Sequence, residues 1–180
     1  MKNVALLIVD VQPCFEGVIP SFDSVVKRCS FAAEAARLLE IPQMMTEQNP
    51  EKLGHTCEAL ATAVGDAPCF PKMAFSAFGA EGLVDCFKDK GIEHLLVAGV
   101  ETPVCVYQTV LDACKQGLGV TVLRDCVGSR RQRDEATVLH TLGRTTDTVS
   151  LPSETVFYSL LGTCEHPYFR AFNELVKSYN

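Results

Sequence analysis

The segment that decides the fold is HLLVAGVETPVCVYQTVLDACKQG, residues 94–117, in which an apolar run leads directly into a segment with helical spacing. Residues 95–100 predict a strand buried on both faces, although an apolar run this short also fits a buried helix. Thr102 is placed to cap the next helix and Pro103 to begin it, because the fixed φ of proline suits the first helical position. The segment therefore predicts a strand, a tight turn and a helix over 103–116.

Cys105 falls in the first turn of that predicted helix. Free backbone N–H groups and the positive end of the helix dipole lie there, and both stabilise a thiolate and lower the pKa of a cysteine. The alternative is that Cys105 is a small buried residue that packs at the start of the helix. Residues elsewhere in the chain decide between these two interpretations.

The same alternation of aliphatic strands and amphipathic helices runs through the chain. Further strands are predicted at 3–11, 42–46, the start of 68–79, 119–125 and 146–151, and further helices at 24–40, 56–64, 82–91, 131–142 and 166–180. Such alternation, with strands aliphatic throughout, is typical of a parallel sheet covered on both faces. We expect a single α/β domain over residues 1–180, with three layers (α/β/α) around a doubly wound, mostly parallel sheet.

Composition excludes several classes of protein. The chain has 180 residues, of which 47% are hydrophobic and 21% charged, as in ordinary globular domains. Its formal net charge of −6 argues against general nucleic-acid binding. No apolar run approaches the length of a membrane span, so we expect no membrane association. Arg130, Arg131 and Arg133 lie beside acidic residues, and we interpret them as a solvated helix start.

The nine cysteines do not indicate a disulfide scaffold. Residues 1–10 lack the pattern of a secretory signal, the cysteine count is odd, and no C-x-x-C pair occurs. We therefore expect reduced thiols and a cytoplasmic protein.

The predicted fold brings certain polar residues together. In doubly wound sheets, ligands bind beyond the carboxyl ends of the strands. The polar residues that follow the predicted strands are Asp10, Gln12, Glu47, Lys72, Glu101, Cys105 and Asp125.

Three of these residues suffice for nucleophilic catalysis. A cysteine attacks only as thiolate, and Asp10 is placed to take its proton. The ammonium of Lys72 would keep Asp10 ionised and further lower the pKa of Cys105. Free N–H groups around 101–105 would stabilise the oxyanion formed by attack on a carbonyl. Taken singly, an aspartate at this position is more often a turn cap and such a lysine more often solvated, but their agreement at one edge favours the catalytic interpretation.

At these residues the sequence resembles the isochorismatase-like cysteine hydrolases. The matching segments are LLIVDVQ (6–12), PKMAFSAF (71–78), GVETPVCVYQTVLDA (99–113) and DCVGSR (125–130), and the resemblance extends to about residue 150. It implies Cys105 as nucleophile, Asp10 as general base and Lys72 as the third member of a triad. It also implies a cis peptide bond between Val100 and Glu101, with the N–H groups of Glu101 and Cys105 as oxyanion donors.

The resemblance also suggests a substrate pocket. Gln12 and Phe15 resemble the pocket wall after the first strand, and Phe75 and Phe78 would line it with apolar surface. The aromatic residues fit an ordinary hydrophobic core equally well.

The sequence departs from the family's metal-binding members in the loop after the second strand. Nicotinamidase-type members carry an aspartate and two histidines there, whereas this chain has TEQNPEKLGHT (46–56). Only Glu47 and His55 in that loop are good metal ligands, so we expect no metal and no other cofactor. Cys14 also replaces a residue that is often acidic. TEQNPEKLG and the late segment SLLGTCEHPYF resemble the isochorismatase-domain-containing branch, in which the substrate is undefined.

The sequence thus predicts a metal-independent cysteine hydrolase that cleaves an amide or related C–N bond of a small molecule through a thioester-type intermediate. The main alternative is a regulatory or interaction protein with the same fold and little turnover. A receiver domain is disfavoured because no second acid adjoins Asp10, and a glutamine-amidotransferase elbow because valines rather than glycines flank Cys105. We also expect a homo-oligomer, from the family resemblance and the apolar segment FYSLLGTCEHPYF (157–169).

Overall fold

The computed structural model describes residues 3–179 and confirms the predicted α/β architecture. Its sheet has six parallel strands in the order β3-β2-β1-β4-β5-β6. The chain winds outward from the central pair β1 and β4 in both directions, as a doubly wound sheet does. The strands are β1 (Val4–Val9), β2 (Gln43–Gln48), β3 (Cys69–Lys72), β4 (His94–Val100), β5 (Gly119–Gly128) and β6 (Val149–Leu151).

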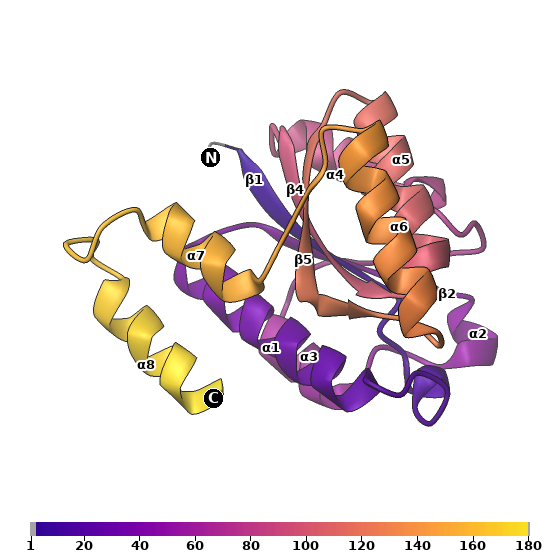
Figure 1. The fold of residues 1–180 in the computed structure, drawn as a ribbon, viewed down its shortest axis with the longest axis horizontal. Helices are drawn as coiled ribbons and strands as arrows, with labels where there is room; N and C mark the ends of the chain where they lie inside the picture. The colour runs from indigo at the N-terminus through magenta and orange to yellow at the C-terminus, as the bar shows by residue number, and fades with distance from the viewer. Residues whose placement is uncertain (1–2, 180) are drawn as a thin grey trace.

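Helices cover both faces of this sheet (Figure 1). The helices on one side are α1 (Phe22–Leu38), α3 (Glu58–Val64), α7 (Ser153–Leu161) and α8 (Phe169–Tyr179). Those on the other side are α4 (Leu83–Asp89), α5 (Tyr107–Lys115) and α6 (Gln132–Thr145). The one-turn helix α2 (Pro50–Leu53) follows β2 at the carboxyl edge of the sheet.

Alternate residues of the central strands enter two separate cores. In β1, Leu6 and Ile8 pack toward α1, whereas Leu7 and Val9 pack toward α4, α5 and α6. Because side chains in a strand point alternately to opposite faces, a strand buried on both faces must be apolar at every position. This explains the unbroken aliphatic run that the sequence shows.

One glycine sets the spacing of the two central strands at their carboxyl ends. Gly99 has φ of 112°, and a Cβ atom there would lie 2.0 Å from the backbone oxygen of Val9. No other residue type fits so close an approach. The two strands therefore end side by side, with Asp10 following β1 and Glu101 following β4.

The boundaries around the decisive segment differ from prediction. The predicted helix at 103–116 is a π-helical segment over Thr102–Val106 followed by α5. Thr102 is not the helix cap: its hydroxyl donates to the backbone oxygen of Gly128 at 3.2 Å, and Glu101 holds the capping position. The Val100–Glu101 peptide bond is cis, as the family resemblance implies.

The C-terminal part contains one helix that we did not predict. Helix α7 lies within the segment after β6, and the predicted closing helix begins only at Phe169, with residue 180 outside the described part. Phe157 of α7 packs edge-on against Phe31 of α1, with ring centroids 6.1 Å apart. Much of the segment 157–169 thus packs on its own chain, which removes one reason to expect association.

An ion pair anchors this C-terminal part to the sheet. Arg28 Nε donates to Asp125 Oδ2 at 2.8 Å, and a further nitrogen of Arg28 donates to Ser153 Oγ at 2.7 Å. The backbone N–H of Ser153 donates to Asp125 Oδ1 at 2.6 Å. These contacts join α1, β5 and the first residue of α7. Asp125 is therefore structural, although its position in the sequence placed it among the candidate site residues.

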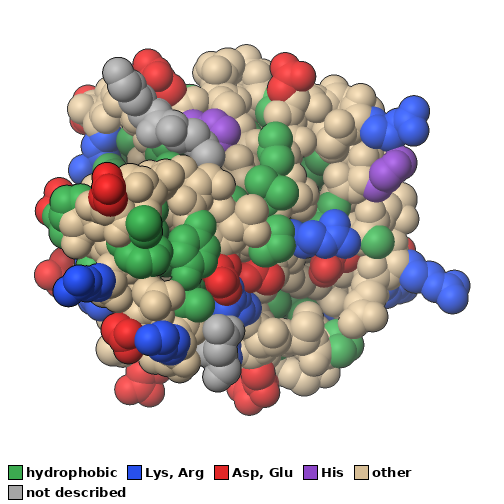
Figure 2. Space-filling model, turned by 60° about the vertical axis from the view of Figure 1, so that its left-hand side comes forward, with side chains coloured by type: hydrophobic (Ala, Val, Ile, Leu, Met, Phe, Trp, Pro, Cys, Tyr) green, Lys and Arg blue, Asp and Glu red, His purple; other side chains and the backbone are tan. Residues whose placement is uncertain are grey.

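The surface around α7 and α8 mixes acidic, basic and hydrophobic side chains and shows no continuous basic patch (Figure 2). Within residues 3–179, no helix is both long and apolar enough to cross a membrane.

Candidate active site at the carboxyl edge of the sheet

A buried ion pair lies where β1 and β3 end. Lys72 Nζ is 2.6 Å from Asp10 Oδ2, and both side chains are fully shielded from solvent. The sequence placed both residues just beyond the strand ends and left open that Lys72 is solvated, whereas the structure buries both. Because charges are buried only when they are paired and hydrogen-bonded, this pair must be closely supported by its surroundings.

Neutral groups supply that support. The Lys72 ammonium also donates to Gln48 Oε1 at 2.8 Å and to the backbone oxygens of Phe75 and Ala74 at 3.0 and 3.1 Å. The hydroxyl of Thr46 donates to Asp10 Oδ1 at 2.8 Å. Each oxygen of the Asp10 carboxylate therefore accepts a hydrogen bond from a different strand.

Cys105 lies close enough to the Asp10 carboxylate for each group to shift the pKa of the other, so the structure brings all three predicted residues together. Burial, followed by the negative charge of Asp10, raises the pKa of Cys105 to about 12, and Lys72 only partly opposes this rise. The expected lowering of that pKa was wrong. Before it meets a substrate, Cys105 is a protonated thiol beside a base rather than a preformed thiolate.

The pKa of Asp10 is raised from its ordinary value. Burial is the largest cause, and hydrogen bonds from Lys72, Thr46 and Cys105 together with the charge of Lys72 oppose it. A carboxyl with a raised pKa is a stronger base than an exposed one, which suits it to accept a thiol proton.

The turn that carries Cys105 is held by an ion pair on its outer side. Arg130 Nε lies 3.0 Å from the carboxylate of Glu101, and the backbone N–H of Arg130 donates to the same group at 3.1 Å. A small cavity of about 90 Å³ lies against these two residues and Pro103. Arg130 thus links the segment between β5 and α6 to the turn, whereas the sequence suggested only a solvated cluster.

Gln12 does not face a substrate pocket. Its Nε2 donates to the backbone oxygens of Gln48 and Gly54, and its Oε1 accepts from the backbone N–H of Gln48 at 2.9 Å. The residue is fully buried, and neither amide hydrogen is left for a ligand. Gln12 therefore holds the loop after β2.

The three aromatic candidates occupy different environments. Phe78 packs in the core beside Phe87, with ring centroids 5.8 Å apart, and Phe15 packs half-buried against the core on the α1 side. Phe75 is 55% exposed, and Met73, two residues earlier, is 72% exposed, which is high for hydrophobic side chains. Of the three aromatic candidates, Phe75 therefore offers the most apolar surface to a molecule in solution, and it lies with Met73 directly after Lys72.

The remaining polar candidates form a separate cluster. The carboxylate of Glu47 accepts from the backbone N–H and hydroxyl of Thr56, at 2.7 and 2.8 Å, and lies 3.0 Å from His55 Nδ1. Burial alone would raise the pKa of Glu47, but these hydrogen bonds outweigh it and lower the pKa. Across residues 3–179, no three His, Cys, Asp or Glu side chains are grouped as metal ligands.

Sequence reasoning missed two contributors, Thr46 and Gln48. Both lie at the carboxyl end of β2, and Gln48 pairs in register with Lys72. Polar residues at the carboxyl ends of strands are site candidates, and this rule applies to Thr46 and Gln48 as it does to Asp10 and Lys72. From the sequence, only Glu47 was selected at this strand end.

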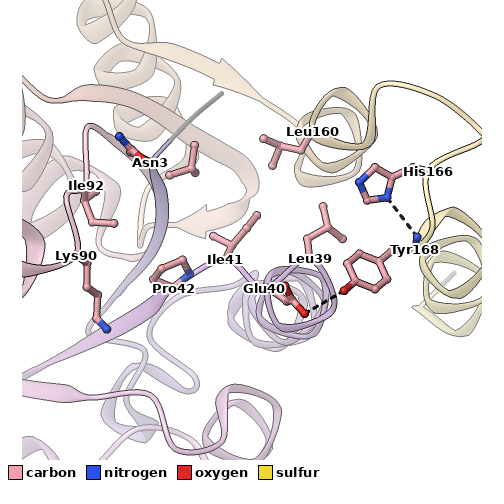
Figure 3. A pocket seen from close by; sticks show the side chains of 11 residues that line it. Asn3, Leu39, Glu40, Ile41, Pro42, Lys90, Ile92, Leu160, His166 and Tyr168 are labelled. Atoms are coloured by element: carbon pink, nitrogen blue, oxygen red, sulfur yellow. Dashed lines mark hydrogen bonds between the residues drawn. The ribbon is translucent and has the colours of Figure 1, made fainter.

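A larger cavity lies at the opposite edge of the sheet (Figure 3). It has a volume of about 390 Å³ and is lined by residues near the amino ends of β1, β2 and β4, together with the segment between α7 and α8. Tyr168 donates from its hydroxyl to Glu40 Oε1 at 3.0 Å on one wall. None of the predicted site residues lines this cavity.

Comparison with known proteins finds relatives over most of the chain. An isochorismatase domain model matches residues 4–151. Isochorismatase domain-containing protein 2 of Bos taurus is 35% identical over 96% of this chain and 82% of its own length. Isochorismatase domain-containing protein 1 of Salmo salar is 31% identical over 94% of this chain, which spans only 59% of the length of that relative.

Among solved structures, one from Caenorhabditis elegans named MAR1 ribonuclease superposes with a TM-score of 0.89, covering 97% of this chain and 90% of that one, at 31% identity. The match to the family model covers all six strands of the sheet and every residue of the buried cluster around Asp10. The chain therefore belongs to the isochorismatase domain family.

Proposed function

We propose that the protein is a metal-independent cysteine hydrolase that cleaves an amide or related C–N bond of a small molecule. The observation that carries this proposal is the fully buried Asp10–Lys72 pair beside the Cys105 thiol. A folded protein retains so costly a group of charges where it serves a purpose, and perturbed pKa values in one cluster are typical of active sites.

In the proposed reaction, Asp10 accepts the Cys105 proton as Sγ attacks the carbonyl carbon. Backbone N–H groups of Glu101 and Cys105 stabilise the oxyanion. As the C–N bond breaks, the leaving nitrogen takes the proton from Asp10, and an acyl thioester remains on Cys105. Water then attacks the thioester carbonyl carbon and gives one proton to Asp10. The C–S bond breaks, the carboxylic acid leaves, and the released Cys105 thiolate takes the proton from Asp10, which restores the enzyme.

Lys72 has an electrostatic role in this proposal. Its ammonium favours ionised Asp10 before attack and stabilises negative charge on sulfur during it. Apolar substrate surface would contact Phe75 and Met73, which are exposed beside the site. No step requires a metal or another cofactor.

The test is intact-mass analysis with a panel of electrophiles and small amides. With small amides we expect one acyl adduct per chain on the native protein, none on Cys105→Ala, and an unchanged one on Cys164→Ala, which removes an exposed thiol. Electrophiles should also label the exposed thiols, equally in the native protein and in Cys105→Ala. Acyl adducts that persist on Cys105→Ala would refute Cys105 as nucleophile. Stable adducts without any turnover would instead favour the regulatory alternative.

A second candidate is ribonuclease activity, which the name of the C. elegans relative favours. The net charge of −6 argues against it, because RNA binding relies on basic surface. Structured and unstructured RNA belong in the same substrate panel. RNA cleavage that Cys105→Ala abolishes would replace the small amide as substrate.

The proposal also includes a homo-oligomer and a cytoplasmic location. Light scattering over a wide concentration range tests the first, and microscopy of the tagged protein tests the second.

A further inference from the structure

We infer that Gln48 is a positioning residue that sets the placement of the Lys72 ammonium in the candidate active site. This inference rests on the proposed function of the Asp10, Lys72 and Cys105 cluster. Gln48 ends β2 directly beside Lys72, which ends β3, so the two side chains leave neighbouring strands at the same level.

The side-chain amide of Gln48 is fixed at both ends. Its Oε1 accepts from Lys72 Nζ at 2.8 Å, and its Nε2 donates to the backbone oxygen of Met73 at 2.9 Å. An amide bound at both ends has one orientation, because reversing it would place Nε2 against the ammonium. Its carbonyl therefore points steadily at Lys72.

The backbone of Gln48 is fixed as well. Gln12 Oε1 accepts from the backbone N–H of Gln48 at 2.9 Å, and Gln12 Nε2 donates to the backbone oxygen of Gln48 at 3.0 Å. Gln12 is fully buried and cannot exchange these partners for water. A continuous series of hydrogen bonds thus leads from Gln12 through Gln48 and Lys72 to Asp10.

The neutrality of Gln48 matters for the chemistry. The ammonium has three hydrogens and four oxygen neighbours, and Asp10 is the one charged acceptor among them. An amide carbonyl can hold the ammonium without competing with Asp10 for its charge. A second carboxylate at this position would weaken that preference and add negative charge near Cys105.

The experiment compares Gln48→Met, which keeps the size but removes the acceptor, with Gln48→Glu, which keeps the acceptor and adds charge. Gln116→Met is the matched control, since Gln116 is exposed on the surface after α5. The readout is the rate of Cys105 alkylation by iodoacetamide as a function of pH, measured by peptide mass spectrometry. The charged groups that face Cys105 in this measurement are Asp10, Lys72 and Glu101.

We expect Gln48→Met to slow alkylation of Cys105 near neutral pH about tenfold, the size expected for loss of one hydrogen bond to a charged group. Gln48→Glu should slow it further and move the profile to higher pH. Gln116→Met should match the native protein.

Native rates and profiles in both folded Gln48 variants would overturn the inference, even if their melting temperatures fall, because a purely structural role moves only stability. If Gln48→Met does not fold, Gln48→Glu decides alone. Asp10→Asn and Lys72→Met, measured in parallel, distinguish failure of the inference about Gln48 from failure of the proposed function. Native alkylation in both of these variants would overturn the proposed function itself.

Discussion

The two edges of the sheet differ in what they bury. At the carboxyl edge, two opposite charges and a thiol are enclosed, and every charged oxygen has a partner. At the amino edge, a cavity of about 390 Å³ opens among half-buried apolar residues, and its charged side chains Glu40 and Lys90 reach solvent (Figure 3).

This difference shows that volume alone does not locate chemistry. Charges at the amino edge remain hydrated, and water screens them. Charges at the carboxyl edge interact in a medium of low polarity, where each contact has a larger effect on the pKa values of its neighbours. Substitutions at the two edges should therefore differ sharply in their effects.

The largest expected effect is on stability at the carboxyl edge. Lys72→Met leaves the Asp10 carboxylate buried without its counter-charge, and we expect it to lower the free energy of unfolding by about 3 kcal/mol. Urea denaturation measures this change. Lys88→Met, at a lysine whose side chain is 71% exposed, should cost far less. The Asp10→Asn/Lys72→Met double variant should lose less than the sum of the two single variants, and strict additivity would contradict the coupling.

Asp10→Asn should lower turnover of any substrate by at least about a hundredfold, because an amide cannot accept the thiol proton. Residue 10 has φ of 55°, a conformation that asparagine adopts readily, so the backbone should be preserved. Steady-state kinetics test the loss, with Asp85→Asn as the control on an exposed surface. A folded Asp10→Asn variant with full activity would exclude the triad.

The third effect is a dependence on pH. The pKa of Cys105 is raised to about 12, chiefly by burial, from an ordinary value of 9.0. A raised pKa favours the folded protein while the thiol stays protonated, so this stabilisation is complete below pH 9 and is lost as the pH rises toward 12. Urea midpoints measured across that range should fall, and less steeply for Cys105→Ala. If the urea midpoint of Cys105→Ala falls with pH as steeply as that of the native protein, Cys105 is not a buried ionisable thiol.

The smallest effect should come from the amino edge. Tyr168→Phe removes the hydrogen bond to Glu40, which lies at the surface. We expect the melting temperature to change by less than about 2 °C and turnover to stay native. A clear loss of activity would show that the two edges are coupled and would contradict the expected difference between them.

The sequence allowed prediction of the layers and the three central residues because both follow from periodicity and from position along strands. It did not reveal what each side chain contacts. Gln12 follows β1 as a pocket residue would, yet its amide binds the neighbouring loop. The pKa of Cys105 was predicted in the wrong direction, because the sequence shows a helix start but not the degree of burial or the distance to Asp10.

Helix α7 was missed although its signals were present. Pro152 precedes it and Gly162 follows it with φ of 71°, a common pair of helix boundaries. Its attachment through Arg28, Asp125 and Ser153 joins residues far apart in the chain, and no local pattern reports such a contact.

Lys72 of the candidate site belongs to β3, the edge strand of the sheet beside β2. Strand β3 has four residues and pairs along one side only, with β2, whereas β1 and β4 each pair on both sides. Edge strands open locally at a lower free energy than central ones. Amide hydrogen exchange should therefore be faster in β3 than in β1, and each opening would carry the ammonium away from Asp10. Under the proposed function, local opening of this sheet edge would then lower the fraction of molecules that hold the ammonium in place at any moment.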